Sequence, residues 1–170
     1  EKIRNICRTT ISHSAVLSLI ADCSQGIEPY YAISYLKRTL GSESIEVVPI
    51  FESIARKEKF YSTELMKKIA LAGSLQYLKE IPEKWRNVFI TASDCSTNNH
   101  LDMLVAFQKN TDNGVSKTLN VPSTATIGEV EDAIRKAYQM GCKSVHIYRE
   151  GSSMQQLMHA KNRKKKRSGV

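Results

Sequence analysis

Residues 115–121 (V-S-K-T-L-N-V) and 145–148 (V-H-I-Y) are two β-rich runs separated by one helical pattern. Pro122 ends the first run, because proline cannot donate a hydrogen bond to a strand ladder. Residues 126–129 (T-I-G-E) form a capping box, in which the threonine hydroxyl and the glutamate carboxylate each pair with a free backbone N–H. We therefore predict a helix from this box to Gly141. Strand, helix and strand in this order form a βαβ unit with parallel strands, so the predicted fold class is α/β.

Apolar periodicity predicts further elements before this unit. Helices are expected after Ser14, from Pro49, from Ser62 to Gly73 and after Asn99, and strands over residues 30–40 and 88–92. The helix faces expected to be buried carry Ile50, Phe51, Ile54 and Ala55; Leu65, Met66, Ile69 and Ala70; Leu101, Leu104 and Val105; and Ile127, Val130, Ile134, Ala137 and Tyr138. Because no repeat or linker divides them, residues 1–151 are expected to form one unit.

The positive charge is concentrated at one end of the chain. The net charge is +8 over 170 residues, and residues 161–167 supply six of these charges, which leaves +2 for the rest. A near-neutral globule with a basic tail is thus indicated. No aromatic residue lies among the basic ones to stack on bases, so we expect residues 152–170 to be a solvated, disordered tail. Nucleic-acid binding by the tail is the weaker alternative.

The four cysteines, Cys7, Cys23, Cys95 and Cys142, are far apart and include no C-x-x-C pair. Their spacing disfavours a zinc ribbon or a redox pair and favours reduced thiols in or near a core. The first residues show no basic-then-apolar leader, and the apolar runs are too short to span a membrane. We expect a cytoplasmic protein with no metal site and no membrane partner.

Four segments, in a fixed order, resemble those of class II ribonucleotide reductases, which depend on adenosylcobalamin. They are residues 5–8 (N-I-C-R), 20–29 (I-A-D-C-S-Q-G-I-E-P), 116–122 (S-K-T-L-N-V-P) and 141–152 (G-C-K-S-V-H-I-Y-R-E-G-S). The family carries similar G-I-E-P, S-K-T-x-N-x-P and G-C-K-x-x-x-x-Y-R-[DE]-G-S segments. The similarity covers residues 3–152.

This resemblance implies part of a ten-stranded α/β barrel, built from parallel strands with crossover helices. A full member converts ribonucleotides to deoxyribonucleotides for DNA synthesis by radical chemistry, in which adenosylcobalamin generates a thiyl radical on a cysteine inside the barrel. The reactive cysteines of the family lie upstream of the part that this sequence matches. The resemblance therefore implies a C-terminal segment of the barrel with no catalytic residue of its own. Its expected partners are the upstream part of the barrel and a ribonucleotide.

The family holds substrate phosphates on a turn between a strand and a helix, usually P-T-G-T, through N–H groups and hydroxyls at the helix start. The corresponding residues here are Ser12, His13, Ser14, Ala15 and Val16. The proline and the glycine are missing, and glycine matters because other residues bring a Cβ between the backbone and a phosphate. Two interpretations remain: a nucleotide-phosphate turn that uses hydroxyls and a protonated histidine, or a plain helix cap that has lost its ligand.

Polar side chains share one side of the predicted strand at residues 115–121. Ser116, Thr118 and Asn120 lie opposite Lys117, which is unusual for a strand expected to be buried on both faces. We interpret these three residues as a polar wall inside the barrel. Asp94 and His100 are either site residues at a strand end or an ordinary loop residue and helix cap.

The leading hypothesis is a segment or split subunit of a reductase that is inactive alone, because part of a barrel leaves strand edges unpaired. The alternative is a degenerate, non-catalytic relative that binds or responds to a nucleotide.

Overall fold

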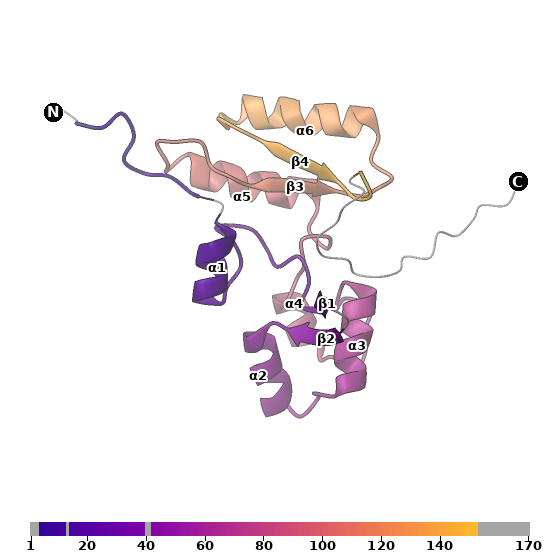
Figure 1. Cartoon of the computed structure of the whole chain (residues 1–170). Helices are drawn as coiled ribbons and strands as arrows, with labels where there is room; N and C mark the ends of the chain where they lie inside the picture. Colours follow the sequence, from indigo (N-terminus) through magenta and orange to yellow (C-terminus); the bar gives the residue numbers. More distant parts are fainter. Residues whose placement is uncertain (1–3, 13, 40–41, 153–170) are drawn as a thin grey trace, which may run out of the picture. The chain divides into compact units, whose positions relative to one another are not determined.

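The computed structural model describes residues 4–12, 14–39 and 42–152, whose elements are labelled in Figure 1. The chain divides into two compact units. Among the described residues, the sheet unit combines those up to Pro29 with residues 95–152, and the hairpin unit consists of residues 30–94. The sequence predicts one unit over residues 1–151, whereas the structure has a second unit, with its own hydrophobic core, inserted between the two parts of the first. The predicted tail after Ser152 lies outside the described residues.

The sheet unit is built on parallel strands. Its elements are α1 (Ala15–Ala21), α5 (Thr97–Gln108), β3 (Thr118–Val121), α6 (Ile127–Gln139) and β4 (His146–Arg149). β3 and β4 pair in parallel, with α6 as the connection between them, which confirms the predicted βαβ unit and the α/β class. β3 is shorter than the strand predicted over residues 115–121. It begins at Thr118, because Val115 is joined only by an isolated parallel bridge to Ile11. The segment ending at Ser12 therefore runs parallel to the residues just before β3 and is joined to them by this one bridge.

Helix α5 buries the face that the sequence predicts. Leu101, Leu104 and Val105 are buried in one cluster with Leu119 of β3. The prediction that Asn99 caps this helix is wrong: α5 begins at Thr97, and the Ser96 hydroxyl accepts the Asn99 N–H at 3.1 Å. A serine side chain just before a helix reaches the N–H of the third helical residue, so the cap lies three positions earlier.

Helix α6 begins at the predicted capping box, whose two reciprocal hydrogen bonds between Thr126 and Glu129 are both present. Its buried face is predicted only in part: Ala137 is buried as predicted, but Ile127 and Tyr138 are more than 80% exposed, and Ala133, which was not predicted, is buried. Two alanines one turn apart let α6 approach the core closely, and the larger apolar side chains then lie outside this contact.

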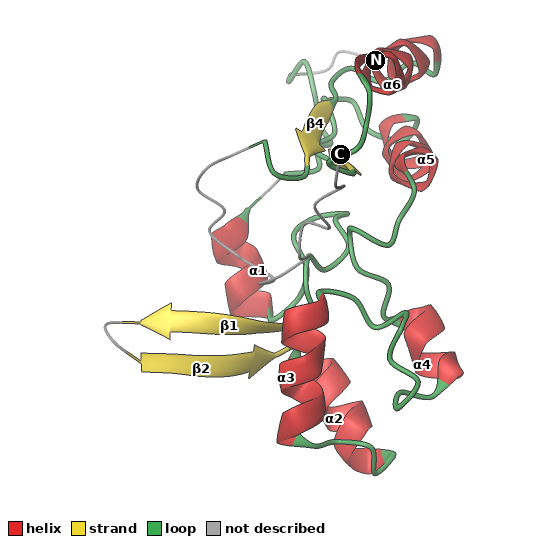
Figure 2. Cartoon of the chain, turned by 90° about the vertical axis from the view of Figure 1, so that its right-hand side faces the viewer, coloured by secondary structure: helices red, strands yellow, loops and turns green. Residues whose placement is uncertain are grey.

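The hairpin unit contains an antiparallel pair, β1 (Ser34–Thr39) and β2 (Ser42–Val47), and three helices, α2 (Pro49–Lys57), α3 (Thr63–Ala72) and α4 (Glu83–Val88), as Figure 2 shows. Pro49 starts α2 and Gly73 ends α3 in a left-handed conformation, as predicted. All four residues predicted for the α3 face are buried. On α2, Phe51 and Ala55 are buried, but Ile50 is 59% exposed, contrary to the prediction.

The strand predicted over residues 88–92 is wrong. Val88 is the last residue of α4, and Phe89 to Ala92 form a loop. The loop has a local alternative to a strand ladder, because the Thr91 hydroxyl and N–H both donate to the Asp94 carboxylate. A buried Phe89 and a buried Thr91 on either side of the partly exposed Ile90 produce the alternating pattern that resembles a strand.

Within the described ranges, no helix combines the length and the hydropathy that crossing a bilayer would need.

Candidate phosphate turn and its sheet

The predicted phosphate turn lies at the end of the first parallel segment of the sheet unit. The Ile11 carbonyl accepts the Ser116 N–H at 3.4 Å, and Ser12 follows directly. Ser14 then caps α1, because its hydroxyl accepts the Leu17 N–H at 3.3 Å and its carbonyl accepts the Ser18 N–H. His13 lies outside the described residues. The structure therefore confirms a cap at Ser14.

The loop that follows α1 returns to Ser12, at the start of the predicted phosphate turn. Gly26 has a φ of +53°, and a Cβ at this position would lie 3.1 Å from the Ser12 carbonyl oxygen. A side chain at Gly26 is disfavoured on both grounds, because L-residues rarely adopt this φ and the close neighbour is backbone. Gly26, the first residue of the G-I-E-P segment, thus lies against the start of the turn.

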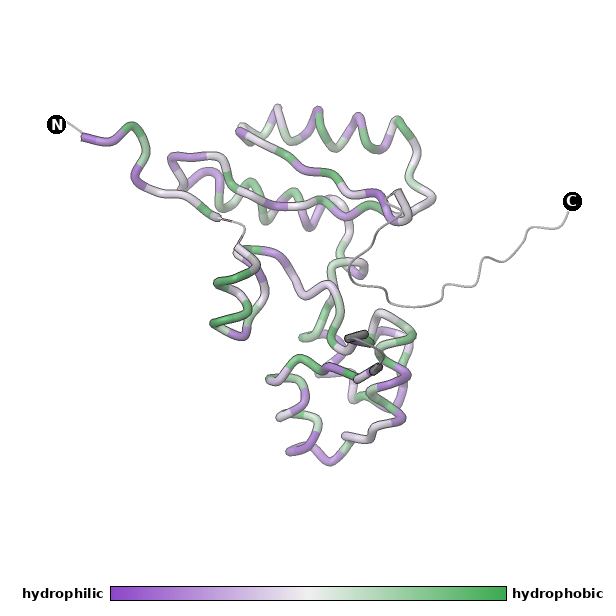
Figure 3. Tube along the Cα trace, viewed as in Figure 1, coloured by the Kyte–Doolittle hydropathy of each residue, from purple (hydrophilic) through white to green (hydrophobic). Residues whose placement is uncertain are grey.

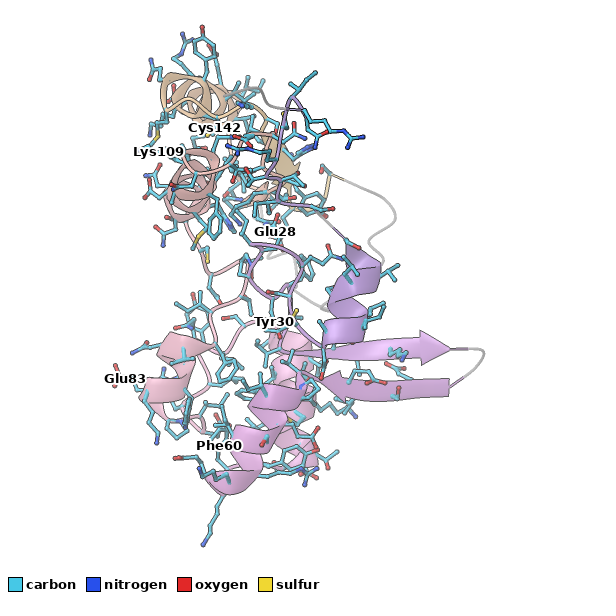
Figure 4. All side chains as sticks on the ribbon, turned by 90° about the vertical axis from the view of Figure 1, so that its left-hand side faces the viewer. Glu28, Tyr30, Phe60, Glu83, Lys109 and Cys142 are labelled. Atoms are coloured by element: carbon cyan, nitrogen blue, oxygen red, sulfur yellow. The ribbon has the colours of Figure 1, made fainter. Side chains whose placement is uncertain are left out.

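Glu28 and Lys117 form a buried ion pair that joins two of the sequence motifs. The Lys117 Nζ lies 2.8 Å from Glu28 Oε2, and the side chains are 1% and 11% exposed. Lys117 also donates to the Ile27 carbonyl, and the Thr118 N–H donates to the other carboxylate oxygen of Glu28. Figure 4 labels Glu28 in the loop that follows α1. The ion pair with Lys117 and the hydrogen bond from Thr118 thus join this loop to the start of β3, a role for Lys117 that the sequence does not reveal.

The polar side of β3 is only partly buried. Val115, Lys117, Leu119 and Val121 are buried and alternate with Ser116, Thr118 and Asn120, which are half-buried. In the parallel register, Thr118 pairs with His146 and Asn120 with Tyr148, so these partners share the same face. Ser12 and Ser116 are brought together by the hydrogen bond between Ile11 and Ser116. The two groups of predicted site residues therefore begin on neighbouring segments of the chain.

Asp112 fastens the first parallel segment to the loop before β3. Its carboxylate accepts the Arg8 N–H at 2.8 Å and the Thr9 N–H at 3.2 Å, and its own N–H donates to the Thr9 hydroxyl. These hydrogen bonds, led by the one from Arg8, hold the pKa of the Asp112 carboxyl below its ordinary value.

Acidification is therefore expected to release this segment. A carboxyl whose pKa is lowered by folding contributes stability above its unfolded value, near pH 4, and loses it as the pH falls through the lower folded value. The amide signals of Arg8 and Thr9, followed by NMR, should titrate with a midpoint below that of an ordinary aspartate. In Asp112→Asn the same signals should show no such titration, and a midpoint at or above the ordinary value in the unmodified chain would contradict the assignment.

The cysteines form no reactive cluster in the described part of the chain. All four are free; Cys7 and Cys23 are exposed, contrary to the expectation of thiols in or near a core, and Cys95 and Cys142 are partly buried. Burial raises the pKa of the Cys142 thiol, which keeps it protonated at neutral pH. No group of three or more potential metal ligands occurs among the described residues. Asp94 serves its own loop, accepting from Thr91 and Ser74, and His100 is buried in α5.

The geometry is that of a parallel α/β sheet with a turn into a helix at one strand end, which is the architecture of a barrel segment. A family model described as the ribonucleotide reductase barrel domain matches residues 2–148. The chain belongs to this family, as the sequence motifs indicate.

Similar proteins are several times longer than this chain. The vitamin B12-dependent ribonucleoside-diphosphate reductase of Thermoplasma acidophilum is 39% identical over 160 residues, which cover 94% of this chain and 21% of that protein. The enzyme of the same name from Mycobacterium tuberculosis is 35% identical over 155 residues, covering 91% and 22%. The Actinobacillus ureae class Id ribonucleotide reductase alpha subunit has a similar fold, with a TM-score of 0.69 at 20% identity over 82% of this chain and 25% of that one. The chain thus spans about a fifth of the length of these curated relatives.

Proposed function

We propose that this chain is the C-terminal segment of a ribonucleotide reductase barrel and takes part in reducing ribonucleotides to deoxyribonucleotides only together with the upstream part of the barrel. The observation that carries the proposal is the match of residues 2–148 to the barrel domain, combined with coverage of only about a fifth of the relatives. The four free thiols fit a reducing compartment, so we place this function in the cytoplasm.

The surface of α1 supports a need for further polypeptide. Figure 3 shows this helix as largely hydrophobic, and Val16, Leu17, Leu19 and Ile20 are between 63% and 80% exposed. Four large apolar side chains on a seven-residue helix are more than an isolated surface usually exposes. The upstream part of the barrel is the partner that we propose for them.

The relatives are named vitamin B12-dependent, and the described residues do not by themselves fit adenosylcobalamin, the form of this vitamin that the sequence motifs imply. A pocket of about 330 Å³ lies near the start of α5 and α6, lined by Ser96, Asn98, Pro122, Glu129 and Lys136 among others. This volume is far below that of a corrin ring with its nucleotide and adenosyl group. We therefore propose that any cofactor binding requires the upstream part, and assign none of its chemistry to residues of this chain.

Within the whole enzyme, we propose that the turn from Ser12 to Val16 faces the substrate phosphates. The Ser14 hydroxyl accepts the Leu17 N–H. The N–H groups of Ala15 and Val16 come before Leu17 at the helix start, where an anion is favoured. Ser116, Thr118 and Asn120 would form the polar wall beside this turn. The half-buried state of these three residues supports a surface that another part of the barrel or the substrate covers.

A chimeric enzyme tests this function directly. The chain replaces the corresponding C-terminal segment of the Thermoplasma acidophilum reductase, and ribonucleotide reduction is measured with adenosylcobalamin and a dithiol. We expect turnover by the chimera and none by the 170-residue chain alone, because a barrel segment carries no complete active site. Turnover by the lone chain, or a folded chimera without activity, would refute the proposal.

The alternative is a degenerate relative that binds a nucleotide without reducing it, which the altered turn favours because it lacks the family's proline and glycine. NMR titration of the lone chain with a ribonucleoside diphosphate separates the two. Saturable shifts at Ser14 together with an inactive chimera favour the degenerate relative, and an unresponsive Ser14 together with an active chimera favours the segment.

A further inference from the structure

The hydrogen-bond ladder beside β3 changes its partner at one position. Alternate residues of a strand direct their N–H groups to the same edge, so Ser116 and Thr118 donate toward the same side of β3. The Ser116 N–H donates to the Ile11 carbonyl of the neighbouring parallel segment. The Thr118 N–H donates to the Glu28 carboxylate instead. Glu28 therefore takes the place of a backbone acceptor where the neighbouring segment leaves the sheet and turns into α1.

The same carboxylate is held in place from a second direction. Lys117, which is 1% exposed, pairs with the other oxygen of Glu28 and also donates to the Ile27 carbonyl. Gly26, two residues earlier, lies against the Ser12 carbonyl, as described above. The loop of Gly26 to Glu28 is thus tied to β3 at one end and touches the beginning of the turn at the other.

A buried ion pair of this kind is poor evidence for stability alone. Replacing both partners by apolar residues is often neutral or stabilising, because the charges no longer have to be removed from water. What an apolar pair cannot supply is an acceptor for the Thr118 N–H at the point where the strand ladder ends. The specific contribution of Glu28 is therefore an acceptor at a fixed position, beside the Thr118 N–H.

We propose that Glu28, held by Lys117, is the positioning residue of the turn from Ser12 to Val16: it closes the ladder of β3 and thereby sets where the preceding segment turns into α1. This inference rests on the proposed function, in which that turn faces the substrate phosphates. Glu28 does not touch the substrate in this assignment; it acts through the backbone of the turn.

Two double variants of the full chain separate the acceptor from the charges. Glu28→Gln with Lys117→Met removes both charges but keeps an amide oxygen that can accept the Thr118 N–H. Glu28→Leu with Lys117→Met removes the charges and the acceptor together, and leaves no unpaired buried charge that would unfold the sheet unit. Amide hydrogen exchange is measured at Leu17 and Ser18, whose N–H groups donate to the hydroxyl and the carbonyl of Ser14 at the end of the turn, with the central amides of α6 as the internal reference.

We expect exchange at the turn to become about tenfold faster or more in the leucine variant, to stay within about twofold of the unmodified chain in the glutamine variant, and to be unchanged at α6 in both. Equal rates at the turn in all three proteins would overturn the proposal, since the pair would then have no influence on the turn. Equal acceleration at the turn and at α6 would also overturn it, because the effect would be general destabilisation.

A titration of the same three proteins with inorganic phosphate keeps the two proposals distinguishable. If the unmodified chain shows no saturable shift at Ser14, the phosphate role of the turn is decided by the chimeric enzyme alone, while the exchange rates still decide the role of Glu28. If phosphate binds and the leucine variant alone loses it, both proposals are supported.

Discussion

Replacing Lys117 by methionine alone is expected to lower the free energy of unfolding of the sheet unit by about 3–5 kcal/mol, because this single change leaves the Glu28 carboxylate largely buried without its cation. The methionine side chain is similar in length to the apolar stem of lysine, so little packing is lost. The measurement is a urea titration followed by the NMR amide signals of β3 and α6.

The matched control is Lys68→Met in the hairpin unit. Lys68 pairs with Glu80 at the same 2.8 Å, but the two side chains are 58% and 49% exposed. An exposed pair contributes about 0–1 kcal/mol, so this variant should unfold almost as the unmodified chain does. Similar losses from both substitutions would show that the burial of the Glu28–Lys117 pair has no energetic consequence.

Truncating Phe51 to alanine is expected to destabilise the hairpin unit by about 3–5 kcal/mol. Its side chain is fully buried, and its ring makes edge contacts with Phe60 and Phe89 at centroid distances of 6.1 and 5.0 Å. The chain has a single tryptophan, Trp85, which lies in the same unit with its ring 6.3 Å from that of Phe89. Tryptophan fluorescence during denaturation therefore reports this unit.

Ile50 provides the comparison on the same helix. It is 59% exposed, so Ile50→Ala should change the stability by no more than about 0.5 kcal/mol. A loss as large as that of Phe51→Ala would restore the face predicted from the sequence and contradict the observed packing of α2.

Elements specified by neighbouring residues were predictable. The capping box at Thr126, the serine caps at Ser14 and Ser62 and the helix start at Pro49 each depend on hydrogen bonds or dihedral angles within a few residues. The structure confirms all of them. The parallel pairing of β3 with β4 followed from the single helix between them, because a crossover of this length joins parallel strands.

Features set by distant residues were not predictable. Residues 88–92 alternate as a strand does, but the Ala92 N–H donates to the Tyr30 carbonyl and the Ser74 hydroxyl donates to Asp94, and these residues form a loop instead. The apolar side chains at Ile127 and Tyr138 follow the helical period, yet the tertiary contact uses Ala133 and Ala137. In both places the local pattern is genuine, and the choice between its alternatives depends on what packs against it.

The sequence by itself determined the α/β class, the family and the position of the strand-to-helix turn, because caps, periodicity and motif order are properties of short segments. Only the tertiary structure decided that Lys117 is buried, that Glu28 is its partner across 89 residues, and that the segment before the turn pairs with Val115 and Ser116. The physical reason is that a lysine and a glutamate in separate motifs are ordinary solvated charges until folding removes both from water, and the cost of that removal makes their pairing necessary.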